Sequence, residues 1–206
     1  MVLSRFGISY TLVDQTDLDA VEAAVTPATK LVWVETPTNP TLKVIDVPGV
    51  VARSRGAIIA RDPEWAERLH FMQRAIGAVP GPQDCFLVHR GLRTLHLRMR
   101  AHAESAEAVV AFLGSVEGVT DVRWPGFSGM VSFRHPEAVA IAEGTEVFTL
   151  AESLGGVESL IEVPAAMTHQ SVEDSDAAVP ADFVRLSCGV EAPEDLVEDL
   201  ARAIGR

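Results

Sequence analysis

The stretch LVWVETPTNPT, residues 31–41, begins as a nearly continuous apolar run and ends in a stiff polar loop. Residues 31–34 predict a buried strand, because parallel strands that are covered on both faces are apolar along their length. The loop holds Asn39 between Pro37 and Pro40, which fix φ on either side of it. Ligands of open parallel sheets bind outside the carboxyl ends of the strands. The pattern favours a ligand contact at Asn39, although an Asn-Pro turn that only redirects the chain fits the same residues.

Strand and helix signals alternate on both sides of this loop. Residues 10–13 predict a strand, and Thr16 is expected to cap the helix that follows, with Asp19 completing a capping box. After the loop, residues 48–55 predict a short helix and residues 57–60 another strand. This alternation predicts an α/β layer, with a parallel-rich sheet and helices on both faces.

The remainder of the chain has a different pattern. Asp62-Pro63-Glu64 predicts a helix start that Gly77 closes. Apolar positions at helical spacing from Gln83 onward predict one long helix, or two end to end. Beyond these helices, strands are expected over 119–124, 130–133 and 183–188, with a final helix over 193–204.

These strands and helices do not alternate strictly, which favours a smaller C-terminal α+β domain. We therefore predict two domains, with a large α/β domain over residues 1–98 and the C-terminal domain over 99–206.

Composition excludes several classes of function. The net charge of −12 and the pI near 4.9 argue against a nucleic-acid or anionic-membrane partner, which would need a basic surface. No apolar segment approaches the roughly 20 residues of a membrane helix, and the first residues lack the apolar core of a signal peptide. The two cysteines, Cys85 and Cys188, have no metal-ligand spacing and are expected to be buried or half-buried thiols. These features predict a cytoplasmic protein without a metal site.

Two later stretches contain further candidate residues. In ESLGGVESL (152–160), the glycine pair can bring main-chain groups around Ser153 towards a ligand, or can simply form a flexible loop. In DFVRLSCGV (182–190), Arg185 lies in the middle of an expected strand. It is either a solvated outer residue or a planar fork for a carboxylate. A nucleophile pair of Cys188 with His169 is a further alternative, but no nearby residue activates either side chain.

Taken together, these stretches resemble the Cys/Met-metabolism family of pyridoxal-phosphate enzymes, the transsulfuration group that includes cystathionine γ-lyase and cystathionine γ-synthase. The resemblance extends over almost the whole chain, and the order of its motifs makes it specific. The motifs are WVETPTNPTLKVID (33–46), GAVPGPQDCFLVHRGLRTLHLRM (77–99), SGMVSF (128–133), FTLAESLGGVESLIEVPAAMTH (148–169) and VRLSCGVE (184–191).

The resemblance implies a fold and a set of site residues. The fold is that of a type I pyridoxal-phosphate-dependent transferase, whose large cofactor domain matches the α/β layer. Asn39 is expected to hydrogen-bond the phenolic oxygen of the cofactor ring, and Arg185 to hold the α-carboxylate of the substrate with the backbone around Ser153. Glu152 favours a substrate with a distal amino group, and Thr168 belongs to the same substrate region. Asn39 and Arg185 are expected to converge on one pocket.

The chain also departs from this family. Its only lysines are Lys30 and Lys43, and neither has the Ser-x-Thr-Lys context in which the family forms its Schiff base, so no catalytic residue is assigned. The aspartate for the pyridine nitrogen and the Ser and Thr for the phosphate are missing too, at a gap expected between Gly56 and Ala57. A further gap is expected at Phe127/Ser128, and the family's N-terminal tyrosine and phosphate-turn motifs have no match.

Two interpretations of these departures remain open. The sequence either joins segments of a longer enzyme or is that of a shortened relative, without catalysis, that acts as a scaffold. For the intact enzyme, the resemblance implies chemistry at the γ-carbon of a sulfur amino acid. Cystathionine γ-lyase activity, which yields cysteine, 2-oxobutanoate and ammonia, is favoured over γ-synthase activity on an activated homoserine ester and cysteine. The resemblance also implies a homotetramer built as a dimer of dimers.

Overall fold

The computed structural model describes residues 9, 11–29, 32, 42, 63–77, 81–167 and 178–205. The chain divides into two compact units, and each is described by itself. The first comprises Met1–Thr36 and Val44–Phe86, and the second Pro37–Lys43 and Leu87–Arg206. Apart from Val32, the elements expected over 31–34, 48–55 and 57–60 lie outside the described residues. The predicted domain boundary at residues 98/99 falls within a helix of the second unit and stays a prediction.

The first described helix, α1 (Leu18–Ala24), begins one residue later than a Thr16 cap requires. Asp17 is the N-cap, and its carboxylate accepts hydrogen bonds from the main-chain N–H groups of Asp19 (3.0 Å) and Ala20 (3.1 Å). Thr16 instead donates its hydroxyl to Asp14 (2.7 Å). The predicted cap is therefore wrong, because an aspartate caps equally well and also places a negative charge at the positive end of the helix dipole.

The strand expected over residues 10–13 is not formed at residues 11–13. A strand needs a neighbour for its N–H and C=O groups, and no described strand pairs with this segment. Val13 instead packs with Leu18 and Val32 around the buried side chain of Val21.

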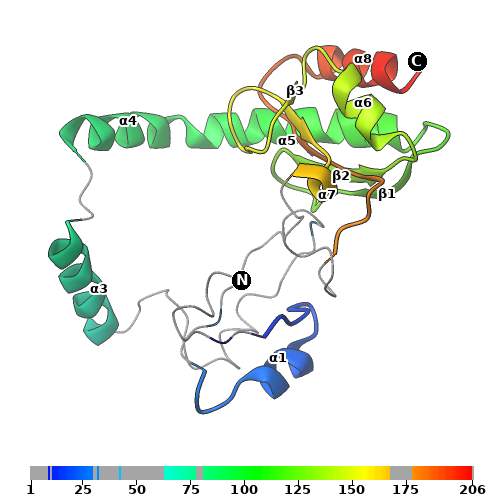
Figure 1. Ribbon diagram of the computed structural model, residues 1–206. Helices are drawn as coiled ribbons and strands as arrows, with labels where there is room; N and C mark the ends of the chain where they lie inside the picture. Colours follow the sequence, from blue (N-terminus) through cyan, green and yellow to red (C-terminus); the bar gives the residue numbers. More distant parts are fainter. Residues whose placement is uncertain are drawn as a thin grey trace. The chain divides into compact units, whose positions relative to one another are not determined.

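Three helices follow along the chain, α3 (Pro63–Ile76), α4 (Pro82–Arg93) and α5 (Leu95–Leu113) (Figure 1). Helix α3 begins at Pro63 as predicted and ends at Gly77, whose φ of +71° is the left-handed conformation common after helices. Helices α4 and α5 run end to end, as one of the two alternatives predicted. They meet at Thr94, where the Arg98 guanidinium donates to the Gly91 carbonyl oxygen (3.0 Å) and the Thr94 hydroxyl.

The second unit contains a mixed five-stranded sheet with strand order β1-β2-β5-β4-β3 (Figure 1). Its strands pair antiparallel, except for β3 with β4. The strands predicted over 119–124, 130–133 and 183–188 correspond to β1, β2 and β5, whereas β3 and β4 were not predicted. The strands are β1 (Thr120–Arg123), β2 (Met130–Arg134), β3 (Thr149–Leu150), β4 (Leu160–Glu162) and β5 (Phe183–Ser187).

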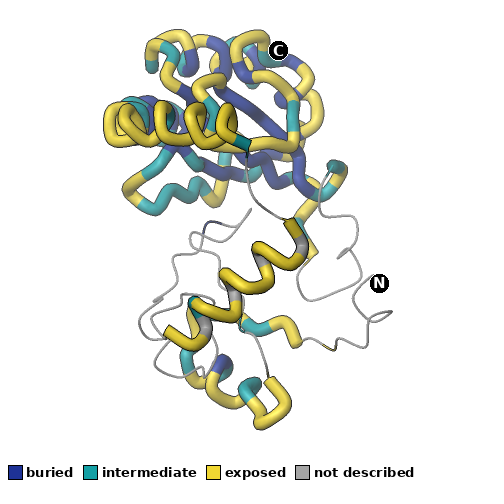
Figure 2. The backbone as a smooth tube through the Cα atoms, turned by 90° about the vertical axis from the view of Figure 1, so that its left-hand side faces the viewer, coloured by how far each residue is buried: buried dark blue, intermediate teal, exposed yellow. Residues whose placement is uncertain are grey.

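The hydrophobic core lies between one face of this sheet and three helices, α5, α6 (Ala138–Gly144) and α8 (Pro193–Ile204). A short helix, α7 (Pro164–Met167), follows β4. Val184 and Leu186 of β5 point into the core, where they meet Leu196 and Leu200 of α8. Figure 2 shows these strands as the dark blue interior of the unit. Alternation then places Phe183, Arg185 and Ser187 on the opposite face of the sheet.

A buried carboxylate fixes the connection between α6 and β3. Asp199 of α8 accepts hydrogen bonds from the main-chain N–H groups of Glu146 (2.8 Å), Val147 (2.9 Å) and Phe148 (2.9 Å), and it pairs with Arg202. A buried carboxylate is tolerated when several donors replace its water shell. The final helix thus holds in place the segment that leads into the edge of the sheet.

Candidate functional site: a buried arginine on the polar face of the sheet

The face of the sheet opposite the core carries a row of polar side chains across three neighbouring strands. Arg185 of β5 is the register partner of Ser132 on β2 and of Glu162 on β4. All three are buried, with relative exposures of 2% for Arg185 and 0% for Ser132 and Glu162. Partners directly opposite in antiparallel strands have Cβ atoms about 4.5–5.5 Å apart, so their side chains can interact.

Arg185 and Glu162 form an ion pair in this row. Nη1 of Arg185 lies 2.9 Å from Oε1 of Glu162. Nη2 donates to two main-chain carbonyl oxygens, those of Glu152 (2.8 Å) and Ser153 (3.1 Å). Of the two interpretations of Arg185, the solvated outer residue is therefore wrong, since the guanidinium is buried and its orientation is fixed on two sides.

The segment that supplies these carbonyls is held to the sheet at several points. The Gly155 N–H donates to the Ser187 hydroxyl (2.8 Å), and Gly155 has a φ of +74°, which favours glycine. The Glu191 carboxylate accepts from the N–H (2.7 Å) and the hydroxyl (2.8 Å) of Ser159. The glycine-containing loop thus has fixed ends and presents its main chain to Arg185.

The structure brings together three of the residues proposed from the sequence. Arg185 is buried beside the main chain of Glu152 and Ser153, whereas both of those residues are themselves exposed. Asn39 and Thr168 lie outside the described residues, so the expected convergence of Asn39 with Arg185 stays a prediction. The roles assigned to all five residues remain proposals.

Two residues of the polar row, Glu162 and Ser132, were not recognised as candidates in the sequence. Glu162 is the single charged residue in the apolar stretch LIEV, and a lone carboxylate in such a stretch predicts a buried partner. The hydroxyl oxygen of Ser132 is buried and has no hydrogen-bond partner among the described residues. Which residues pair with Arg185 depends on strand pairing between distant segments, which the local sequence does not specify.

The cysteine alternative is not supported by the structure. Cys188 is fully buried, and burial is the main reason that its thiol pKa is raised to about 12, with a smaller contribution from the Glu191 carboxylate. A thiol with such a pKa stays protonated at neutral pH, whereas the nucleophile is the thiolate. Its proposed partner, His169, lies outside the described residues. Cys188 is therefore a core residue.

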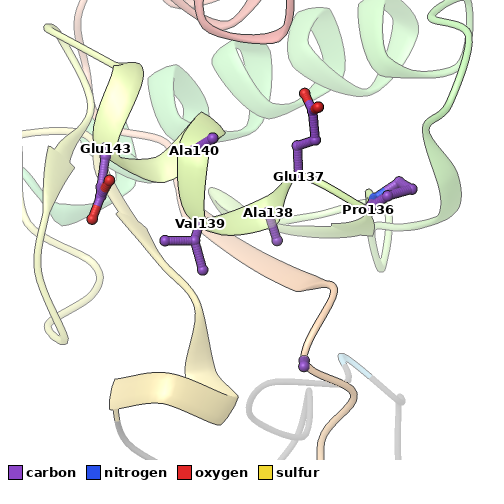
Figure 3. Close-up of a pocket in the computed structure, with 7 residues that line it drawn as sticks. Pro136, Glu137, Ala138, Val139, Ala140 and Glu143 are labelled. Carbon is purple, nitrogen blue, oxygen red and sulfur yellow. The ribbon is translucent and has the colours of Figure 1, made fainter.

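Elsewhere in the described structure, the paired Asp199 and Arg202 line a pocket beside α8. A shallow pocket beside α6 is lined by two carboxylates, Glu137 and Glu143, and otherwise by apolar side chains; Figure 3 shows the two carboxylates pointing away from each other.

Within the described ranges, no three His, Cys, Asp or Glu side chains are arranged to hold a metal ion. None of the helices described is both long enough and apolar enough to cross a membrane.

A buried arginine with an orienting carboxylate, on a sheet covered by helices, defines a candidate carboxylate-binding site. Comparison with known proteins identifies the family of the chain. The family model described as "Cys/Met metabolism PLP-dependent enzyme" matches residues 1–55 and 52–205.

Individual relatives match over nearly the whole chain. Cystathionine gamma-synthase of Mycobacterium tuberculosis is 40% identical over 268 residues, which cover 99% of this chain and 69% of that protein. Cystathionine gamma-lyase of Macaca fascicularis is 37% identical, covering 98% and 67%. The crystal structure of metB from Corynebacterium glutamicum superposes with a TM-score of 0.92 at 35% identity, covering 99% of this chain and 70% of that chain.

The chain belongs to the Cys/Met-metabolism family of PLP-dependent enzymes. Three predictions are thereby confirmed. The chain belongs to the transsulfuration group, it is an enzyme, and its cofactor is pyridoxal phosphate. The predicted fold class is confirmed in its coarser form, a mixed sheet with helices that matches solved structures of this kind. The strands expected over 31–34 and 57–60 lie almost entirely outside the described residues, so the predicted parallel-rich sheet stays a prediction.

The comparisons also support an internal gap in the chain. The alignment extends over 268 residues although the chain has 206, so internal segments of the relatives have no counterpart here. The two matched segments of the family model meet at residues 52–55, next to the gap expected after Gly56. The only lysines of the chain, Lys30 and Lys43, lack the sequence context of the family's Schiff-base lysine, so the residues present do not fit the cofactor.

Cys188 is buried as predicted, whereas the prediction for Cys85 is wrong, because Cys85 lies on α4, which has no buried residue among those described. The two exposures lead to a prediction about thiol reactivity. In the native chain at pH 8, we expect a disulfide reagent such as dithionitrobenzoate to modify one thiol, the exposed Cys85, because the Cys188 thiol is both inaccessible and protonated. In guanidinium chloride, two thiols should react. Rapid modification of two thiols in the folded chain, or of Cys188 in a Cys85→Ser variant, would contradict this assignment.

Proposed function

We propose that Arg185 holds the α-carboxylate of an amino-acid substrate. The observation that carries this proposal is the burial of its guanidinium in a fixed orientation, between the Glu162 carboxylate and the carbonyls of Glu152 and Ser153. A guanidinium fork matches the geometry of a carboxylate, and an oriented fork loses little entropy when the ligand binds. The family to which the chain belongs acts on amino acids that carry such a group.

The reaction that we propose for the intact enzyme takes place at the γ-carbon of a sulfur amino acid. Cystathionine γ-lyase activity, with cystathionine cleaved to cysteine, 2-oxobutanoate and ammonia, is the activity favoured by the sequence motifs. Cystathionine γ-synthase activity is the second candidate, because the relative with that name has a slightly higher identity than the γ-lyase, 40% against 37%. Bound pyridoxal phosphate would supply the electron sink that this chemistry requires.

Glu152 and Thr168 are proposed to determine the specificity of the same site, and Asn39 to contact the cofactor ring. Glu152 is exposed and adjoins Ser153, while its own carbonyl accepts a hydrogen bond from Arg185. Its carboxylate could therefore reach a distal ammonium of a substrate whose α-carboxylate is held by Arg185. This geometry supports cystathionine, which has a second amino group, as the substrate of the intact enzyme.

The carboxylate site can be tested on the chain itself. In an NMR titration of chain labelled with ¹⁵N-arginine, we expect L-norvaline to shift one buried guanidinium resonance. We expect Arg185→Gln to abolish both this resonance and the binding, because a neutral amide forms no ion pair with the carboxylate. Arg134→Gln is the matched control, since Arg134 pairs with Asp182 and its side chain is partly exposed. Binding that is equal in Arg185→Gln and in the unmodified chain would contradict the proposal.

The activity can be tested on the full product of the gene. If the sequence joins segments of a longer enzyme, that product exceeds 22.1 kDa, is yellow, and is trapped on one lysine by borohydride. Release of 2-oxobutanoate from cystathionine without added thiol would identify a γ-lyase. Activity only with an activated homoserine ester and cysteine would identify a γ-synthase. A colourless product of 22.1 kDa, inactive in both assays, would establish the shortened scaffold instead.

We further propose that the chain forms a homotetramer through surfaces that include α4. Every described side chain of α4 is at least partly exposed, and four of them are large and apolar: Phe86, Leu87, Val88 and Leu92. Sedimentation equilibrium should give four times the mass of one chain. Val88→Glu with Leu92→Glu should reduce this mass, because two charges cannot be buried there at low cost, whereas His89→Glu should change it less. If the unmodified chain stays monomeric in this experiment at a concentration of about 100 μM, the proposal is contradicted.

A further inference from the structure

Glu162 has a feature that the binding of a carboxylate by Arg185 does not require. Its carboxylate already neutralises the guanidinium at 2.9 Å, in a pair where both side chains are buried. A second carboxylate that binds Arg185 therefore lies close to the negative charge of Glu162, in a site shielded from solvent. In such a site, interactions between charges are much stronger than in water. Whether a ligand binds well then depends on whether it brings a positive charge of its own.

We propose that Glu162 is a specificity-determining residue that selects zwitterionic amino acids over simple carboxylates. This inference rests on the proposed carboxylate site at Arg185. An amino acid carries an ammonium group next to its carboxylate, and the attraction of this group to Glu162 offsets the repulsion between the two carboxylates. A carboxylate without the amine, such as a 2-oxo acid formed as product, meets the repulsion of Glu162 without this compensating attraction. Glu162 thereby favours the substrate and weakens the binding of the deaminated product.

The arrangement of the strands supports a role for the charge of Glu162 beyond its hydrogen bond. The main-chain carbonyls of Glu152 and Ser153 already orient the guanidinium at Nη2, and a neutral acceptor at the position of Glu162 would orient Nη1 equally well. A glutamine has the same length and keeps a carbonyl oxygen as acceptor. Replacing the charge alone therefore separates electrostatic selection from the positioning of Arg185.

Two variants distinguish charge from geometry. Glu162→Gln keeps the acceptor and removes the charge, whereas Glu162→Asp keeps the charge and alters the geometry. Asp182→Asn is the control, because it also removes a carboxylate charge that pairs with an arginine, Arg134, but outside the polar row. L-Norvaline and pentanoate are the matched ligands, since they differ only in the α-ammonium group. Their dissociation constants are measured by the arginine NMR titration, with thermal unfolding as a check of the fold.

In the unmodified chain, we expect norvaline to bind more tightly than pentanoate. In Glu162→Gln, the preference for norvaline should fall at least about tenfold, because pentanoate loses a repulsion while the norvaline ammonium loses an attraction. Glu162→Asp and Asp182→Asn should keep the preference within about threefold of the unmodified value, which is well below the tenfold effect expected for Glu162→Gln.

Three results would overturn the inference, and they separate it from the proposed function. An unchanged preference in Glu162→Gln, with binding still abolished in Arg185→Gln, contradicts the role of Glu162 and leaves the carboxylate site intact. An equal loss of preference in Glu162→Asp and Glu162→Gln shows that geometry, not charge, controls selection. Failure of both ligands to bind the unmodified chain, or binding that persists in Arg185→Gln, contradicts both the site and the inference.

Discussion

The ion pair between Arg185 and Glu162 is the interaction on which the candidate site depends. Both charges are removed from water, and their mutual attraction and hydrogen bonds must offset the cost of that desolvation. Removing one partner of such a pair typically costs about 3–5 kcal/mol, because the other charge is left buried and uncompensated. The pair therefore constrains the register of β4 against β5. A slip of one residue would turn Arg185 towards the apolar core and Leu186 towards the polar face.

The rest of the second unit holds this pair in place. Helices α5, α6 and α8 cover the apolar face of the sheet, so the polar row of Ser132, Arg185 and Glu162 lies on the opposite face. Ser187 and Glu191 anchor the glycine-containing loop whose carbonyls contact Arg185. Successive residues of β5 thus point to opposite faces of the sheet. Those on one face stabilise the core, and those on the other face belong to the candidate site.

The sequence predicted the elements that carry strong local signals. Proline and acidic residues mark the starts of α3 and α8, Gly77 marks an end, and β1, β2 and β5 have apolar or β-branched runs. Strands β3 and β4 span two and three residues, too few for a periodic pattern. The helix cap was predicted one residue too early. Both Thr16 and Asp17 suit the N-cap position, and local preference does not distinguish between them.

The candidate site was predictable only in part, for a related physical reason. Arg185 was identified from its place in a strand, but whether it was solvated depended on burial, which is a property of the whole fold. Glu162 was missed because its partnership with Arg185 joins segments about twenty residues apart through strand pairing. The family resemblance supplied the remaining residues, and the proposals for Asn39 and Thr168 rest on that resemblance.

A crystal structure of the chain with bound L-norvaline is the most direct test of this account. It should place the ligand carboxylate within hydrogen-bond distance of the Arg185 guanidinium, with Glu162 still paired to Nη1. A ligand carboxylate bound elsewhere, or a guanidinium that has left Glu162 to bind it, would contradict the account.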